Sequence, residues 1–74
     1  MPRYEVVLFN EKVRACVRRG ERHEGYDDSW GDTHYIEVLA PTEDMARAKI
    51  QKQYPPNRGF VIEQISQVMP DGEF

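Results

Sequence analysis

The chain has 74 residues, of which 39% are hydrophobic and 31% are charged, and its formal net charge is −3. This length leaves room for one small core, and the composition is that of a soluble folded domain rather than a disordered segment. No apolar run approaches the roughly 20 residues that a membrane-spanning helix needs, and the N-terminal residues lack the pattern of a secretion signal. We therefore expect neither membrane insertion nor export.

Cys16 is the only cysteine, so the chain cannot form an internal disulfide. A small domain without disulfides fits a reducing compartment, and we expect a cytoplasmic protein. A core of this size supplies only about 3–5 kcal/mol, and natural domains of this length often gain stability from a partner subunit. These two points together favour a protein that associates with another chain.

The first part of the sequence predicts a hairpin. Residues 3–9 are rich in β-branched and aromatic side chains and are apolar on both faces, which predicts a central strand. Residues 12–19 alternate Val13, Ala15 and Val17 with polar or small side chains, which favours a second strand. A short helix remains the alternative, because Val13, Cys16 and Val17 also fall at helical spacing.

A loop separates this hairpin from the rest. Residues 20–32 contain three glycines and several aspartates without any apolar period, which predicts an unusually long loop. Residues 33–40 alternate again and predict a third strand. Loops of this length are often functional, so a site is most expected there.

The second half predicts a helix and a last strand. Thr42 is a suitable N-cap, and Ala46, Ile50 and Tyr54 form a helical stripe that ends before Pro55. Residues 59 to about 68 predict the last strand, parallel to its neighbour in the sheet because a helix connects the two. Residues 69–74 are expected to be a loose tail.

The sequence therefore predicts one α+β domain over residues 1–74, with an ordered core at about 3–68. The expected order is β-β-β-α-β, forming a four-stranded mixed sheet with one helix across one face. The other face is left for water or a partner.

Charge is distributed unevenly along the chain. Residues 1–23 hold six basic and three acidic residues, whereas residues 24–45 hold seven acidic residues and no lysine or arginine. This asymmetry indicates either a basic ligand-binding surface or two neighbouring segments that neutralise each other. The second interpretation is favoured.

Metal and catalytic motifs are weak. His23, Asp27, Asp28, Asp32 and His34 have the right chemistry for a metal site, but their spacing matches no known ligand pattern, and solvated loop carboxylates explain them as well. Cys16 is interpreted as a packing residue rather than a nucleophile. We expect no cofactor, no metal and no enzymatic activity.

Nucleic-acid binding is the main alternative function. Four arginines precede two aromatic residues, a mixture that binds single-stranded nucleic acids, although the acidic stretch would repel a phosphate backbone. Trp30 either contributes to a binding surface or folds back over the open end of the core. The arginines in question are Arg14, Arg18, Arg19 and Arg22.

The favoured hypothesis is a small protein-interaction or accessory module that binds a protein partner or forms a homodimer. It would use the uncovered face of the sheet or the loop around Trp30. The candidate surface residues are Tyr26, Trp30, Arg14, Arg18, Arg19, His23, Asp27 and Asp28. The alternative is a single-stranded nucleic-acid-binding module that uses the arginine-bearing segment 12–19.

Overall fold

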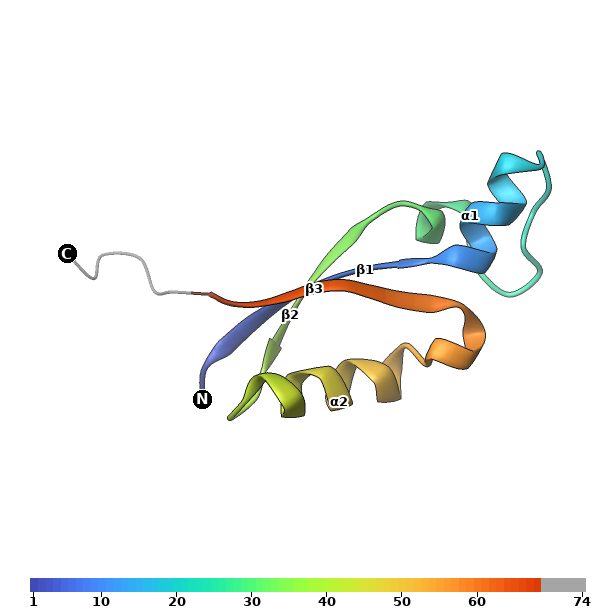
Figure 1. Cartoon of the computed structure of the whole chain (residues 1–74). Helices are drawn as coiled ribbons and strands as arrows, with labels where there is room; N and C mark the ends of the chain where they lie inside the picture. The colour runs from blue at the N-terminus through green and yellow to red at the C-terminus, as the bar shows by residue number, and fades with distance from the viewer. Residues whose placement is uncertain (69–74) are drawn as a thin grey trace.

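The computed structural model describes residues 1–68, which form a small α+β domain of order β-α-β-α-β (Figure 1). A three-stranded antiparallel sheet and two helices make up most of it. The elements are β1 (Arg3–Asn10), α1 (Glu11–Arg18), the 3₁₀ turn η1 (Asp28–Gly31), β2 (His34–Leu39), α2 (Glu43–Gln53), the 3₁₀ turn η2 (Pro56–Arg58) and β3 (Phe60–Val68).

The sheet order is β2-β1-β3, and β1 is antiparallel to both neighbours. The central position expected for the first strand is confirmed. The prediction of a four-stranded mixed sheet is wrong, because residues 12–19 do not form a strand. The last strand is also not parallel to its sheet neighbour: it pairs with β1, which lies between it and β2.

Segment 12–19 is a helix because both of its ends are capped. The Asn10 side chain accepts hydrogen bonds from the backbone N–H groups of Lys12 and Val13, each at 3.0 Å. At the other end Gly20 adopts φ +70°, which a glycine reaches without steric cost. The N–H of Gly20 donates to Val17 and that of Glu21 to Cys16, so the last carbonyl groups are satisfied. The alternative considered for this segment is therefore the correct one.

The second helix covers one face of the sheet, as expected. Thr42 accepts a hydrogen bond from the N–H of Met45 at 3.2 Å, so the predicted N-cap is confirmed. Ala46 and Ile50 are buried against the inward-facing residues of β1. Figure 1 shows α2 along one side of the three strands, with α1 beyond the end of β1. The buried side chains from β1 are Tyr4, Val6 and Leu8.

The long loop closes one end of the core. Trp30, on η1, packs against Phe60 and Tyr54 with ring centroids 5.5 Å and 5.4 Å apart. Of the two interpretations of Trp30, the structure supports the one in which it folds back over the core end. The loop is also partly regular, because Asp27 accepts a hydrogen bond from the N–H of Ser29 and caps η1.

Within residues 1–68, no helix has the length and apolar character needed to cross a membrane. The tail expected at residues 69–74 lies outside the described part of the chain.

Candidate functional site

The face of the sheet opposite α2 is exposed over much of its area. We call it the open sheet face. Tyr35 and Leu39 on β2 keep 67% and 50% of their surface accessible, while Val7 beside Tyr35 is half-buried. Phe9 and Val61, paired across β1 and β3, continue the apolar surface towards α1. An exposed aromatic and an exposed leucine on one sheet face form a candidate contact surface.

Charged residues interrupt the open sheet face at one level. Glu5 and Glu37 are directly opposite each other on β1 and β2, and like charges in this position repel. Arg3 forms an ion pair with Glu37 at 3.5 Å, although both side chains are more than half exposed and the pair contributes little. The two glutamates therefore leave this level of the face with an excess of negative charge.

Arg14 of α1 covers the other end of the open sheet face. Its guanidinium carbon lies 3.7 Å from the centre of the Phe9 ring, a cation–π contact. Its Nε donates a hydrogen bond of 2.7 Å to the carbonyl of Gly31. These two contacts fix the guanidinium in place.

A cleft of about 530 Å³ lies between α1 and η1, next to this arginine. We call it the α1–η1 cleft. Gly31 forms part of its floor and approaches α1 closely, since a Cβ at this position would lie 3.1 Å from the Cα of Arg14. The cleft is lined by Arg14, Val17, Arg18, Asp28, Ser29, Gly31, Asp32 and Thr33.

The cleft contains charges of both signs. Within the described residues, Arg14 and Arg18 form no ion pair with Asp28 or Asp32. The basic and acidic segments do lie side by side, as the favoured interpretation of the charge asymmetry requires. Thr33 lies at the border between the cleft and the open sheet face and donates a long 3.5 Å hydrogen bond to Glu63.

Most of the predicted surface residues line one of two hollows. Arg14, Arg18 and Asp28 line the α1–η1 cleft. His23, Tyr26 and Asp27 line a smaller hollow of about 120 Å³, together with Arg22 and Asp28. Asp28 is the residue that connects the two.

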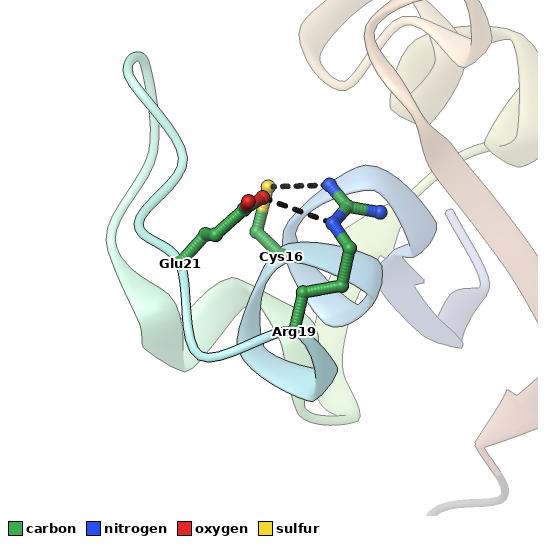
Figure 2. Close-up of polar contacts among 3 residues, drawn as sticks. All are labelled: Cys16, Arg19 and Glu21. Carbon is green, nitrogen blue, oxygen red and sulfur yellow. Dashed lines mark hydrogen bonds and ion pairs between the residues drawn. The ribbon is translucent and has the colours of Figure 1, made fainter.

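Arg19 belongs to neither hollow. Figure 2 shows its Nε bonded to Glu21 at 2.9 Å and an Nη beside the sulfur of Cys16 at 3.7 Å. The hydrogen bond and the charge of Glu21 raise the pKa of Arg19 above its ordinary value. Arg19 thus bonds locally at the C-terminal end of α1.

The aromatic residues of the loop are occupied by packing. Tyr26 meets the edge of Phe60 at 5.2 Å, and Trp30 stacks on His34 at 4.3 Å. The His34 Nε2 donates to the carbonyl of Ser29 at 2.8 Å, which places a proton on that nitrogen. Among residues 1–68, no three His, Cys, Asp or Glu side chains converge as metal ligands.

Sequence reasoning did not select the open-face residues Tyr35 and Leu39. The sequence predicted an uncovered sheet face but did not show which side of strand 33–40 would lie on it. In the three-stranded sheet Tyr35 and Leu39 lie on the face opposite α2, with 67% and 50% of their surface exposed.

No protein-family model matches the chain, and no curated protein or solved structure shows significant similarity to it. The fold and the two surfaces define the class as a small α+β domain with an open sheet face and an adjoining mixed-charge cleft.

Proposed function

We propose that this chain is a protein-interaction module that self-associates through the open sheet face. The observation that carries the proposal is the exposure of Tyr35 and Leu39 beside Val7 on a sheet face opposite the covering helix. Water-exposed apolar side chains gathered on one face gain free energy when a second apolar surface covers them. A second copy of the same face offers such a surface.

The size of the surface sets the strength expected. A standard interface buries about 800 Å² of surface on each partner. Three strands spaced about 4.8 Å apart give a face of smaller area than this. The α1–η1 cleft adjoins the face and extends it. We therefore expect association in the micromolar range rather than the nanomolar range.

The surface favours a protein over a nucleic acid as partner. Trp30 and Tyr26, which a single-stranded nucleic acid would need as stacking platforms, pack into the aromatic cluster around Phe60. Asp28 and Asp32 line the same cleft as Arg14 and Arg18 and would repel phosphates. The arginines also lie on a helix rather than on the strand of the alternative hypothesis.

The proposal describes a binding module without catalytic activity, acting in a reducing, cytoplasmic compartment. The unpaired Cys16 supports that compartment, because it leaves the chain without an internal disulfide.

The test is a pair of matched variants. Tyr35→Lys places a charge in the open sheet face, and Met45→Lys makes the same change at a half-exposed apolar residue of α2. Sedimentation equilibrium should show at least about a tenfold rise in the dimer dissociation constant for Tyr35→Lys alone. Equal effects from both variants would contradict a role for this face.

The rival function is tested by titrating single-stranded RNA at low salt. We expect no change in tryptophan emission and no salt-dependent binding. An RNA complex that weakens with salt and is lost in Arg14→Ala with Arg18→Ala would replace the proposal by the nucleic-acid-binding alternative.

A further inference from the structure

We propose that two copies dock through their open sheet faces with β1 of one copy running antiparallel to β1 of the other. In this arrangement Arg14 of each copy binds the Glu5 and Glu37 carboxylates of the other. This inference rests on the proposed self-association and specifies its geometry. It assigns the fixed guanidinium at the end of the open sheet face a binding role.

The open sheet face has matching charges on either side of its centre. The pair Val7 and Tyr35 marks the centre. Phe9, which contacts the Arg14 guanidinium, lies two residues after Val7 on β1. Glu5 lies two residues before Val7. Both steps measure about 6.6 Å along the strand, because a strand rises about 3.3 Å per residue. The backbone positions of Phe9, which carries the guanidinium on its ring, and of Glu5 are therefore equally distant from the centre.

A two-fold axis can pair two such faces in two ways. An axis parallel to the strands places each residue of one face opposite the same residue of the other copy, so Arg14 meets Arg14 and the glutamates meet glutamates. An axis across the strands reverses the strand direction and brings Phe9 with its arginine opposite Glu5. Only the second arrangement joins opposite charges, and like-charge contacts at an interface are costly.

The distances between packed sheets fit this contact. Sheets that pack face to face are about 10 Å apart. The Arg14 guanidinium lies 3.7 Å from the centre of the Phe9 ring, and because Phe9 belongs to the open sheet face, a glutamate of the opposing sheet would come close to it. Its Nε is bonded to Gly31, which leaves the two terminal nitrogens for a carboxylate. A guanidinium fixed in advance loses little conformational entropy on binding.

The glutamates have a physical need for a further cation. Glu5 and Glu37 face each other across adjacent strands, and within residues 1–68 Arg3 forms an ion pair with Glu37 but none with Glu5. A second guanidinium from the other copy offsets the repulsion that remains. Glu63 opposes the contact, because its bond to Thr33 holds an acid near the Arg14 end of the face. Neutralising it with Glu63→Gln should therefore tighten the dimer.

The experiment is a charge exchange measured by sedimentation equilibrium on the full chain. Arg14→Glu and Glu37→Arg should each raise the homodimer dissociation constant by about a hundredfold, since each dimer contains two such contacts worth about tenfold apiece. An equimolar mixture of the two variants should form a heterodimer within about tenfold of wild-type affinity. One of its two contacts is the native pair of Arg14 and Glu37, and the other contact is the same pair with the two charges exchanged.

Two controls separate the charge contact from other effects. Arg47→Glu makes the same charge change on an exposed position of α2 and should leave the dissociation constant unchanged. Arg14→Gln, checked by circular dichroism, removes the charge with less risk to the Gly31 contact and should weaken the dimer about tenfold or more.

The outcomes distinguish this inference from the proposal on which it rests. A wild-type monomer overturns both. A wild-type dimer that tolerates Arg14→Gln and Arg14→Glu, or a mixture of variants that does not recover affinity, overturns the antiparallel docking and leaves another mode, such as pairing of strand edges. Recovery confined to the mixture supports it.

Discussion

A Cβ atom added at Gly59 would lie 2.6 Å from Oδ1 of Asn10. These two residues, far apart in the sequence, join the start of α1 to the start of β3. Asn10 is completely buried and donates from Nδ2 to the carbonyl of Arg58 at 3.1 Å, while the N–H of Glu11 donates to the carbonyl of Gly59 at 2.8 Å. One side chain thus caps a helix and holds the turn that precedes the last strand.

Replacing Asn10 by alanine should cost about 2–4 kcal/mol of unfolding free energy. The change removes the N-cap of α1 and leaves the Arg58 carbonyl without its donor. Urea denaturation measures the loss, with Thr42→Ala as the control, because that exposed cap should cost only about 1 kcal/mol. Equal losses for both variants would show that the buried contacts of Asn10 add nothing.

Replacing Gly59 by alanine should destabilise the protein more than the same change at Gly20. Both glycines have positive φ, which costs other residues about 1–2 kcal/mol. At Gly20 an added Cβ meets no atom within 4 Å, whereas at Gly59 it collides with Asn10. Gly20→Ala therefore measures the backbone strain alone, whereas Gly59→Ala adds the clash with Asn10 and should have the lower melting temperature. Similar melting temperatures for the two variants would contradict the close approach.

The same residues explain how far the sequence predicted the fold. Residues 3–9 were predicted as a strand from their β-branched and aromatic side chains, and residues 33–40 and the helix after Thr42 from their apolar periods. The last strand was expected at residues 59–68. Segment 12–19 was assigned as a strand because Val13, Ala15 and Val17 alternate. Asn10 before it and Gly20 after it are the cap residues of a short helix, and this signal was given too little weight.

The candidate site was predicted only in part. Arg14, Arg18 and Asp28 do share a cleft, but the contact of Arg14 with Phe9 depends on where α1 leaves the sheet. The spacing of residues in the sequence does not predict the direction in which α1 leaves the sheet. For Trp30 the sequence left open a binding role and packing over the core end, and the structure shows the packing.

Replacing Trp30 by alanine should lower the unfolding free energy by about 2–4 kcal/mol. The side chain contacts Tyr54, Phe60 and His34, and its loss leaves the end of the core open. Tyr35→Ala is the control, because this exposed tyrosine should cost less than about 0.5 kcal/mol. Chemical denaturation under dilute conditions measures both, and a neutral Trp30→Ala would contradict the packing of the loop.

Asp27 should titrate below its ordinary pKa of 3.8. Hydrogen bonds from the side chain and the backbone N–H of Ser29 lower this pKa, since they favour the charged carboxylate. The contribution to stability is present above the unfolded pKa and is lost as the pH falls through the lower folded value. A carboxyl-detected NMR titration checks the midpoint. Ser29→Ala should move the midpoint upwards, and an unchanged midpoint would contradict the assigned cause.

The most direct test of the self-association is the mass of the purified wild-type chain measured by light scattering across a concentration series. We predict a monomer at high dilution and a dimer that forms in the micromolar range, because the open sheet face is exposed but smaller than a standard interface. A monomer that persists at about a millimolar would contradict the account, since a surface built for pairing binds more tightly than that.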